Sequence, residues 1–228
     1  MKVISFSLWG DRPALVAGAL ANARLAREHY PGWSCRIYAC NDVPERDIQA
    51  LRSAGFKVFT CERPSPESWA GLFWRFEPAS DPAVDVFISR DLDSRLNPRE
   101  AAAVQDWLSS DFEFHSMRDH YQHTVPILGG MWGCRRNAWF GKQLDAWTTR
   151  SEKGSDQDFL AQKIWPEVRQ RCLVHDRYTV DTPMFVDGLS WAYKPREFFG
   201  EQNLRAFPAH APLDPTLHGE HVGARVGL

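Results

Sequence analysis

The chain has 228 residues, of which 43% are hydrophobic and 25% are charged, the composition of a folded globular protein with one large domain or two small ones. Intrinsic disorder is thereby excluded. Lys and Arg number 27 and Asp and Glu 29, so the net charge of −2 gives no positive field for nucleic acid or an anionic membrane. An anionic ligand must therefore be bound locally, by a metal ion or a few placed cationic groups.

Compartment and targeting follow from what the chain lacks. The first ten residues are too short and too polar for a signal peptide, and no segment approaches the roughly 18 apolar residues of a spanning helix. The five cysteines are scattered and contain no Cys-x-x-Cys pair, which argues against a disulfide framework and a structural zinc site. We expect a cytoplasmic protein with no transmembrane segment and no nucleic-acid partner, while peripheral membrane association and oligomeric state stay open.

The first half of the chain alternates strand and helix patterns, which is typical of a parallel α/β sheet. Helices are predicted from a cap at Asp11, from Pro44 to Gly55, over residues 69–76, and from a cap at Asn97. Strands are predicted at residues 2–8, 35–39, 56–60 and 84–88, the last being apolar enough to be buried on both faces.

The second half contains fewer clear signals. Ser155 is predicted to cap a helix that runs to about Trp165. Strands are predicted at residues 112–117, 125–133 and 172–175. We find no repeat or linker, so residues 1–228 are predicted to form a single domain, whose irregular segment from about residue 181 to 228 can close over a ligand.

Two acidic residues follow the strand at 84–88 directly. Asp91 and Asp93 are two apart, so in an extended chain their carboxylates point to the same side and can share one ion. The carboxyl ends of strands are where α/β sheets bind ligands. Mg²⁺ or Mn²⁺ takes such oxygen ligands and leaves positions for the oxygens of a diphosphate. The alternative is a solvated turn that pairs with its own arginines.

Four motifs in order give the chain a resemblance to glycosyltransferases of the GT-A fold. It is similar to the group that contains glycogenin and the bacterial lipopolysaccharide galactosyltransferases, and to small bacterial glycan-synthesis proteins with an R-D-x-D-S-R signature. The resemblance covers residues 2–160. The matching segments are Phe73-Trp74-Arg75-Phe76, Phe87-Ile88-Ser89-Arg90-Asp91-Leu92-Asp93, Ile127-Leu128-Gly129-Gly130-Met131-Trp132-Gly133 and Ser155-Asp156-Gln157-Asp158-Phe159-Leu160.

The resemblance implies a fold and a set of roles. The fold is a single-domain, Rossmann-like α/β/α sandwich with a mixed, mainly parallel sheet. Asp91 and Asp93 would bind Mn²⁺ or Mg²⁺. His221 is the candidate third ligand, although His210 and His218 lie close by, and the lysine and proline that follow this histidine in the group are missing. Nucleotide-sugar contacts would come from Trp9, Arg75, Arg90, Asp91, Gly130, His120 and Asp158, and catalytic roles from Asp156, Gln157 and Asp119.

Several of these residues have simpler interpretations. Trp9 could be a core residue instead of stacking on a nucleobase. Asp156 or Asp158 could simply cap the N-terminus of a helix, where the helix dipole favours carboxylates. Asp119 and His120 are interpreted as lining the sugar or acceptor pocket, against a pairing of Asp119 with Arg118. A zinc site is the further alternative there, with His115, His120 and His123 as potential ligands.

We therefore predict a metal-dependent transferase that moves a sugar from a nucleoside diphosphate sugar, with a UDP-sugar as the first expectation, to a hydroxyl of a glycan or lipid-linked acceptor in bacterial surface glycan synthesis. Two rival functions remain: a metal-dependent phosphohydrolase that uses the same carboxylates, and a non-catalytic carbohydrate-binding protein that presents tryptophan faces to sugar rings.

Overall fold

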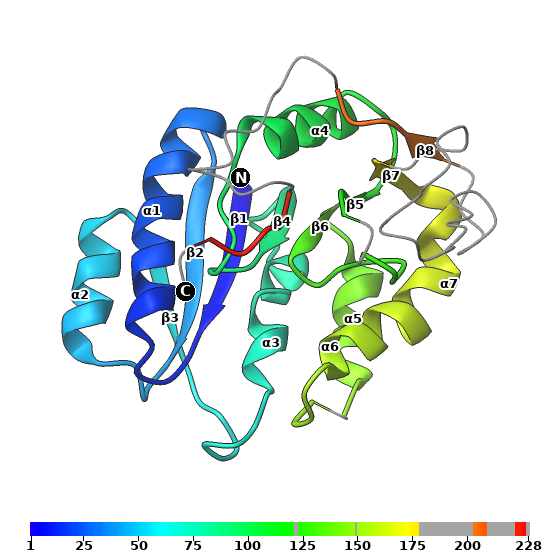
Figure 1. Cartoon of the computed structure of the whole chain (residues 1–228). Coiled ribbons are helices and arrows are strands. Elements are labelled where there is room, and N and C mark those ends of the chain that lie inside the picture. The colour runs from blue at the N-terminus through cyan, green and yellow to red at the C-terminus, as the bar shows by residue number, and fades with distance from the viewer. Residues whose placement is uncertain (121–122, 149, 178–202, 209–221, 227–228) are drawn as a thin grey trace, which may run out of the picture.

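The computed structural model describes residues 1–120, 123–148, 150–177, 203–208 and 222–226. Its centre is an eight-stranded sheet in the order β3-β2-β1-β4-β6-β5-β7-β8 (Figure 1). The strands are β1 Lys2–Leu8, β2 Ser34–Cys40, β3 Lys57–Cys61, β4 Val86–Arg90, β5 Phe114–Arg118, β6 Met131–Arg135, β7 Cys172–Asp176 and β8 Leu204–Arg205. Among them β6 alone runs antiparallel to its neighbours, β4 and β5, so the predicted mixed, mainly parallel sheet is confirmed.

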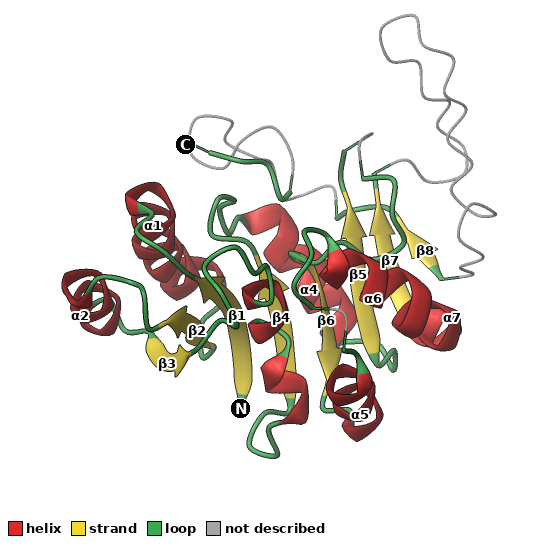
Figure 2. Ribbon diagram, turned by 90° about the horizontal axis from the view of Figure 1, so that it is seen from below, coloured by secondary structure: helices red, strands yellow, loops and turns green. Residues whose placement is uncertain are grey.

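Helices cover both faces of the sheet, which makes three layers (Figure 2). One face packs against α1 Pro13–His29, α2 Glu45–Ser53 and α4 Pro98–Leu108 in a single apolar cluster. The other face packs against α3 Gly71–Trp74, α5 Ala138–Ala146, α6 Ser155–Phe159 and α7 Trp165–Val168. Between α6 and α7 lies one π-helical turn, Leu160–Ile164. The predicted α/β/α sandwich is therefore the observed one.

Strand β4 shows why this sheet must be covered twice. Val86 and Ile88 belong to the cluster under α1, α2 and α4, whereas Phe87 belongs to the opposite cluster. All five residues of β4 are buried. Burying a side chain such as Phe87 contributes about 2 kcal/mol, so an apolar run of this kind is stable only inside a two-faced sheet. The strand is thereby fixed, and so is the edge where Asp91 follows it.

Three predicted boundaries are wrong in detail. Asp11 does not cap α1, which begins at Pro13, a residue with no N–H that would need an acceptor. Ser155 does not cap α6; the preceding Gly154, with φ of +85°, takes that position, and the Ser155 hydroxyl donates to the carbonyl of Glu152 at 2.9 Å. The strand predicted over residues 125–133 begins only at Met131, so the glycine pair before it lies in a loop.

The helix predicted over residues 69–76 is shorter than expected. Only Gly71–Trp74 is α-helical, and a 3₁₀ turn follows at Glu77–Ser80. Pro78 in that turn has no N–H for a continuing helix. The break leaves Arg75 at the end of α3, where its backbone N–H donates to the Ser7 hydroxyl of β1 at 3.0 Å.

Across the parts of the chain that the structure describes, no helix is both long and apolar enough to cross a bilayer.

Candidate functional site

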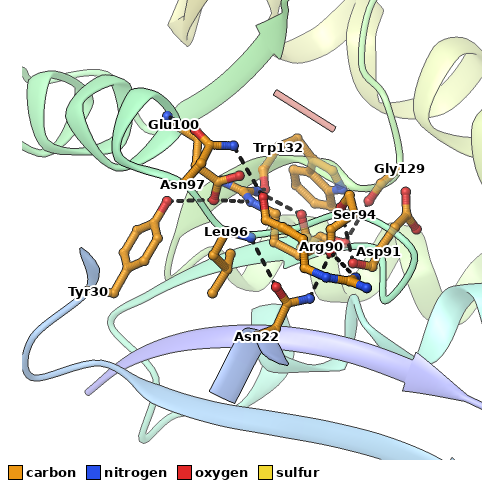
Figure 3. A network of polar contacts seen from close by, with 12 residues as sticks. Asn22, Tyr30, Arg90, Asp91, Ser94, Leu96, Asn97, Glu100, Gly129 and Trp132 are labelled. Carbon is orange, nitrogen blue, oxygen red and sulfur yellow. Dashed lines mark hydrogen bonds and ion pairs between the residues drawn. The ribbon is translucent and has the colours of Figure 1, made fainter. Parts of the chain in front are cut away.

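The acidic pair lies at the carboxyl end of β4, in the turn that leads to α4. The turn is held by a network that includes α1 (Figure 3). The Ser94 hydroxyl donates to the carbonyl of Asp91 at 3.2 Å. The buried Asn22 side chain donates to the carbonyl of Ser94 at 2.9 Å and accepts from the backbone N–H of Leu96 at 3.0 Å. The positions of Asp91 and Asp93 are therefore set by a residue some seventy positions earlier in the chain.

Sequence reasoning missed Asn22. The signal for it is a polar side chain at a helical position between buried apolar residues of α1, such as Ala19 and Leu25. A buried amide needs partners for both its N–H and its C=O groups, and here the two partners are backbone groups of the turn.

Arg75 joins the two acidic motifs. Its guanidinium is buried and forms ion pairs with Asp91 and with Asp156, the latter at 2.8 Å. Burial by itself would lower the pKa of Arg75, but the two carboxylates outweigh it and raise that pKa, so the side chain stays charged. The structure therefore brings together three residues that the sequence analysis assigned to one site, from the end of α3, the end of β4 and the start of α6.

The glycine pair before β6 fits against this cluster. A Cβ added at Gly129 would lie 2.5 Å from Arg75 Nη2 and 2.7 Å from the Asp156 carboxylate, and one at Gly130 would collide with the carboxylate of Asp91. Gln157 holds the loop: its Oε1 accepts from the Gly129 N–H at 2.5 Å, and its Nε2 donates to the Ile127 carbonyl at 3.4 Å. Glycine is needed here because backbone passes directly over charged side chains.

The carboxylates of the acidic pair suit a divalent cation. The Asp91 side chain is 45% exposed, which leaves it accessible to a ligand, and that of Asp93 is 21% exposed. Burial and the neighbouring Asp91 raise the pKa of Asp93, against the lowering effect of Arg225. Two hard oxygen donors of this kind match Mg²⁺ or Mn²⁺.

A third metal ligand cannot be assigned from the described residues. Among them no group of three His, Cys, Asp or Glu side chains comes together as a metal site. The candidate third ligand His221 and its neighbours His210 and His218 lie outside the described residues. The segment that follows, Val222–Val226, does reach the acidic pair: Arg225 Nε lies 3.0 Å from the Asp93 carboxylate.

Arg90 corrects one expectation, because it does not face this cluster. Its side chain is buried and paired with Glu100 of α4 at 3.0 Å, and Tyr30 donates to the same carboxylate at 2.7 Å (Figure 3). One guanidinium nitrogen also donates to the carbonyl of Trp132 in β6 at 3.2 Å. Arg90 thus ties β4 to α4 and β6 on the interior side, which leaves no access for a nucleotide sugar.

Trp9 is also a core residue. It is only 8% exposed and packs edge-to-face against Trp69 and Trp74, with ring centroids 6.1 and 6.4 Å away. Arg12 lies over its ring at 5.3 Å, so the aromatic surface that a nucleobase would stack on is already covered. Trp9 is therefore a core residue and does not present a stacking surface to a nucleobase.

Asp119 is fully buried and ion-paired, but with Arg99 of α4 and not with the adjacent Arg118, which pairs with Asp176. The Asp119 carboxylate has no exposed surface and both of its oxygens accept from Arg99, so a substrate hydroxyl has no access to it and the expected catalytic role is not supported. His120 is half-buried, and its backbone N–H donates to the ring of His123 at 3.1 Å.

The zinc alternative fails for a simple geometric reason. His115 points into the core, where its ring bonds to that of His175 at 2.8 Å and stacks on Trp107, so it cannot join the other two histidines.

Asp158 points away from the cluster. It lies two positions after Asp156 in α6, on the other side of the helix, and is exposed. A carboxylate in the first turn of a helix is stabilised by the helix dipole, which accounts for Asp158 without a ligand.

Comparison with known proteins was made at the level of sequence and of fold. A scan against protein-family models and a search of curated proteins found no match. Among solved structures, mannosyltransferase PcManGT from Pyrobaculum calidifontis, solved in complex with GDP-Man and Mn²⁺, aligns with a TM-score of 0.52 and 14% identity over 77% of this chain and 54% of its own. The fold is of the GT-A type. This chain therefore spans about half the length of that mannosyltransferase.

The same fold is shared with a protein of another kind. The 4-diphosphocytidyl-2C-methyl-D-erythritol synthase from Anaerococcus prevotii aligns with a TM-score of 0.51 and 8% identity over 82% of this chain and 94% of its own. Galactosyltransferase LgtC, solved in complex with donor and acceptor sugar analogues, aligns with a TM-score of 0.41 and 13% identity over 70% of this chain and 69% of its own. A TM-score this low supports no argument. At these identities a likeness establishes the fold, and the activity must be argued from the site.

Proposed function

We propose that this protein is a glycosyltransferase that moves a sugar from a nucleoside diphosphate sugar to an acceptor hydroxyl. The observation that carries the proposal is the convergence of Asp91, Arg75, Asp156 and the Gly129–Gly130 loop at the carboxyl edge of the sheet. Ligands bind at that edge in open α/β sheets. A net charge of −2 is compatible with an anionic donor because the positive charge at this site is local.

Asp91 and Asp93 would hold Mn²⁺ or Mg²⁺. When bound, the cation would neutralise charge on the diphosphate and favour its departure from the sugar. Arg75 is the protein's own cation at this position, already charged and directed at Asp91. We infer that Arg75 exchanges part of its contact with Asp91 for a phosphate oxygen when the donor binds, because guanidinium binds both groups through the same fork of N–H donors.

Asp156 and the glycine loop would shape the sugar pocket. Asp156 is 3% exposed and uses one carboxylate oxygen on Arg75, which leaves acceptor capacity for sugar hydroxyls. Gln157 orients the loop through both polar atoms of its amide, so we assign it a positioning role. The departing diphosphate leaves positive charge on the sugar ring, as in glycoside hydrolysis.

The finer assignments extend the proposal. We propose a UDP-sugar as donor and a glycan or lipid-linked acceptor, in bacterial surface glycan synthesis, with peripheral attachment to the membrane as one arrangement. The five cysteines are all free thiols in the structure, which supports a reducing compartment such as the cytoplasm.

The test measures nucleoside diphosphate binding and turnover in one set of variants. Calorimetry with UDP and GDP, with and without Mn²⁺, should show binding that requires the metal in the native protein and is lost in Asp91→Asn and Asp93→Asn. The matched control is Asp111→Asn, an exposed acid in the loop before β5 at the opposite edge of the sheet, which should bind normally. Equal affinity in all four proteins would refute the metal site.

The same preparation separates the rival functions. Incubation with a panel of nucleotide sugars and Mn²⁺ should release nucleoside diphosphate from one donor, faster when acceptor is added. Release of inorganic phosphate from phosphate esters would indicate a phosphohydrolase. Sugar binding without turnover would indicate a carbohydrate-binding protein, but no tryptophan in the described parts of the chain is exposed as such a surface requires.

A further inference from the structure

Asp119 is held in one orientation by Arg99. The carboxylate follows β5, has no exposed surface, and accepts from Arg99 Nη2 on one oxygen at 2.7 Å and from Arg99 Nε on the other at 2.9 Å. Arg99 is itself fixed, because it belongs to the first turn of α4 and its guanidinium lies 4.2 Å from the ring centroid of Phe207. A two-point contact of this kind sets direction as well as distance.

Oδ2 of Asp119, which accepts from Arg99 Nε, also binds a segment near the C-terminus. Asp119 Oδ2 accepts from the backbone N–H of Val222 at 2.9 Å, across 103 positions of sequence. The Val222 side chain is fully buried beside Met117, Met131 and Phe207. Asp119 therefore holds the first residue of segment 222–226 by a polar contact. We call this segment the C-terminal strap.

From this anchor the strap runs to the acidic pair. Gly223 adopts a φ of +80°, and a Cβ there would lie 2.5 Å from the sulfur of Met131, so only glycine passes. Arg225 then bonds to the Asp93 carboxylate, and the Val226 N–H donates to the Asp93 carbonyl at 2.9 Å. The carbonyl of Val226 accepts from Arg95 at 3.0 Å. Figure 1 shows the strap, in red, passing the end of β4.

We propose that Asp119 is a positioning residue: with Arg99 it anchors the C-terminal strap and thereby sets the strap against the Asp91 and Asp93 carboxylates. This replaces the catalytic role expected from the sequence. Its consequence for ligand affinity rests on the proposed function, whereas the anchoring itself does not.

The anchoring is tested by hydrogen exchange followed by mass spectrometry. In Asp119→Asn the charge is lost and an NH₂ group replaces one of the two carboxylate oxygens, so the two-point contact with Arg99 breaks and the bond from the Val222 N–H is no longer made to a charged, fixed acceptor. Peptides containing residues 222–226 should therefore exchange roughly tenfold faster, the factor expected when a hydrogen bond to a charged group is lost. Peptides from β1 and β4 should exchange as in the native protein. The control is Asp111→Asn, at the other end of β5, which should leave the strap protected. A folded Asp119→Asn protein with native exchange in the strap would overturn the proposal.

A second variant tests the proposal independently, in case Asp119→Asn does not fold. Gly223→Ala displaces the strap from Met131 and leaves the Asp119–Arg99 pair intact. Both variants should shift the Mn²⁺-dependent affinity for UDP or GDP in the same direction and by a similar factor, and the double variant should shift it no further than the larger single change, since both act through one segment. Additive shifts, or native affinity in a variant whose strap exchanges freely, would overturn the proposal. If the native protein binds neither nucleotide with Mn²⁺, the proposed function fails, and the exchange result still decides the anchoring.

Discussion

At the scale of single residues, Arg75 determines the charge balance of the site. It is the buried cation between two carboxylates that come from different elements, Asp91 after β4 and Asp156 in α6. Without it, these carboxylates would face each other across the glycine loop with no protein cation between them. A buried charge that loses its partner destabilises a fold more than the pair itself stabilises it.

Arg75→Ala should therefore lower the free energy of unfolding by roughly 3 kcal/mol in metal-free buffer, less than for a wholly buried pair because Asp91 is part-exposed. Mn²⁺ should then stabilise the variant more than the native protein, because the cation no longer competes with a guanidinium for Asp91. Urea denaturation with and without Mn²⁺ measures both effects. Arg24→Ala, on the exposed face of α1, should change stability by less than about 0.5 kcal/mol. An Arg75→Ala protein as stable as Arg24→Ala would contradict this account.

At the scale of elements, the site depends on how α4 begins. Asn97 caps the helix, its side chain accepting from the backbone N–H of Glu100 at 2.9 Å, and Pro98 occupies the first helical position. The first turn then supplies both Arg99, which holds Asp119, and Glu100, which holds Arg90. A change at the cap should therefore reach the site through two ion pairs.

Among the described residues, two helices begin with an asparagine cap, which allows a matched comparison. Asn97→Ala and Asn137→Ala should each cost about 1 kcal/mol of stability, because Asn137 caps α5 in the same way, accepting from the Phe140 N–H at 3.2 Å. Only Asn97→Ala should also weaken Mn²⁺-dependent nucleotide binding. Chemical denaturation gives the first quantity and calorimetry the second. An equal loss of affinity in both variants would show that general destabilisation is responsible.

The start of α4 also shows what sequence could predict. The Asn-Pro-x-Glu signal is local, since the cap, the proline and the bonded N–H lie within four residues, and its prediction is confirmed. The resemblance to GT-A glycosyltransferases also implied that Asp91, Arg75 and Asp156 share one site. Strand geometry predicts this for Asp91 alone, which follows β4, because Arg75 ends α3 and Asp156 lies in α6.

The failures concern side-chain direction. Trp9 was predicted at the right place along the chain, but its partners come from residues about sixty positions later, and no local pattern indicates them. Asp119 is paired with Arg99 and not its neighbour Arg118 because successive residues near the end of a strand point to opposite faces. The sequence therefore predicts which segments reach the site, and tertiary packing decides which of their side chains face it.

At the scale of the whole molecule, a buried histidine pair links the sheet to α4. The rings of His115 in β5 and His175 in β7 bond at 2.8 Å, and His175 bonds to Asp106 of α4 at 3.0 Å. Burial lowers the pKa of His175 to about 4 against the raising effect of Asp106, and burial lowers that of His115 well below its ordinary value. In mildly acidic solution both rings are therefore protonated in the unfolded chain and lose that proton on folding.

This pair should make the stability of the fold depend on pH. His175 titrates near 6.5 in the unfolded chain and near 4 in the folded one, so between these values the unfolded chain binds more protons. Stability should therefore be full above pH 6.5 and fall as the pH drops toward 4, with His175 contributing on the order of 3 kcal/mol to the loss. His175→Gln cannot take up this proton. It should be less stable than the native protein at pH 7, but its stability should fall less as the pH drops. Urea midpoints measured from pH 7.5 to 4.5 give both slopes, and parallel slopes for the native protein and the variant would rule out His175 as the cause.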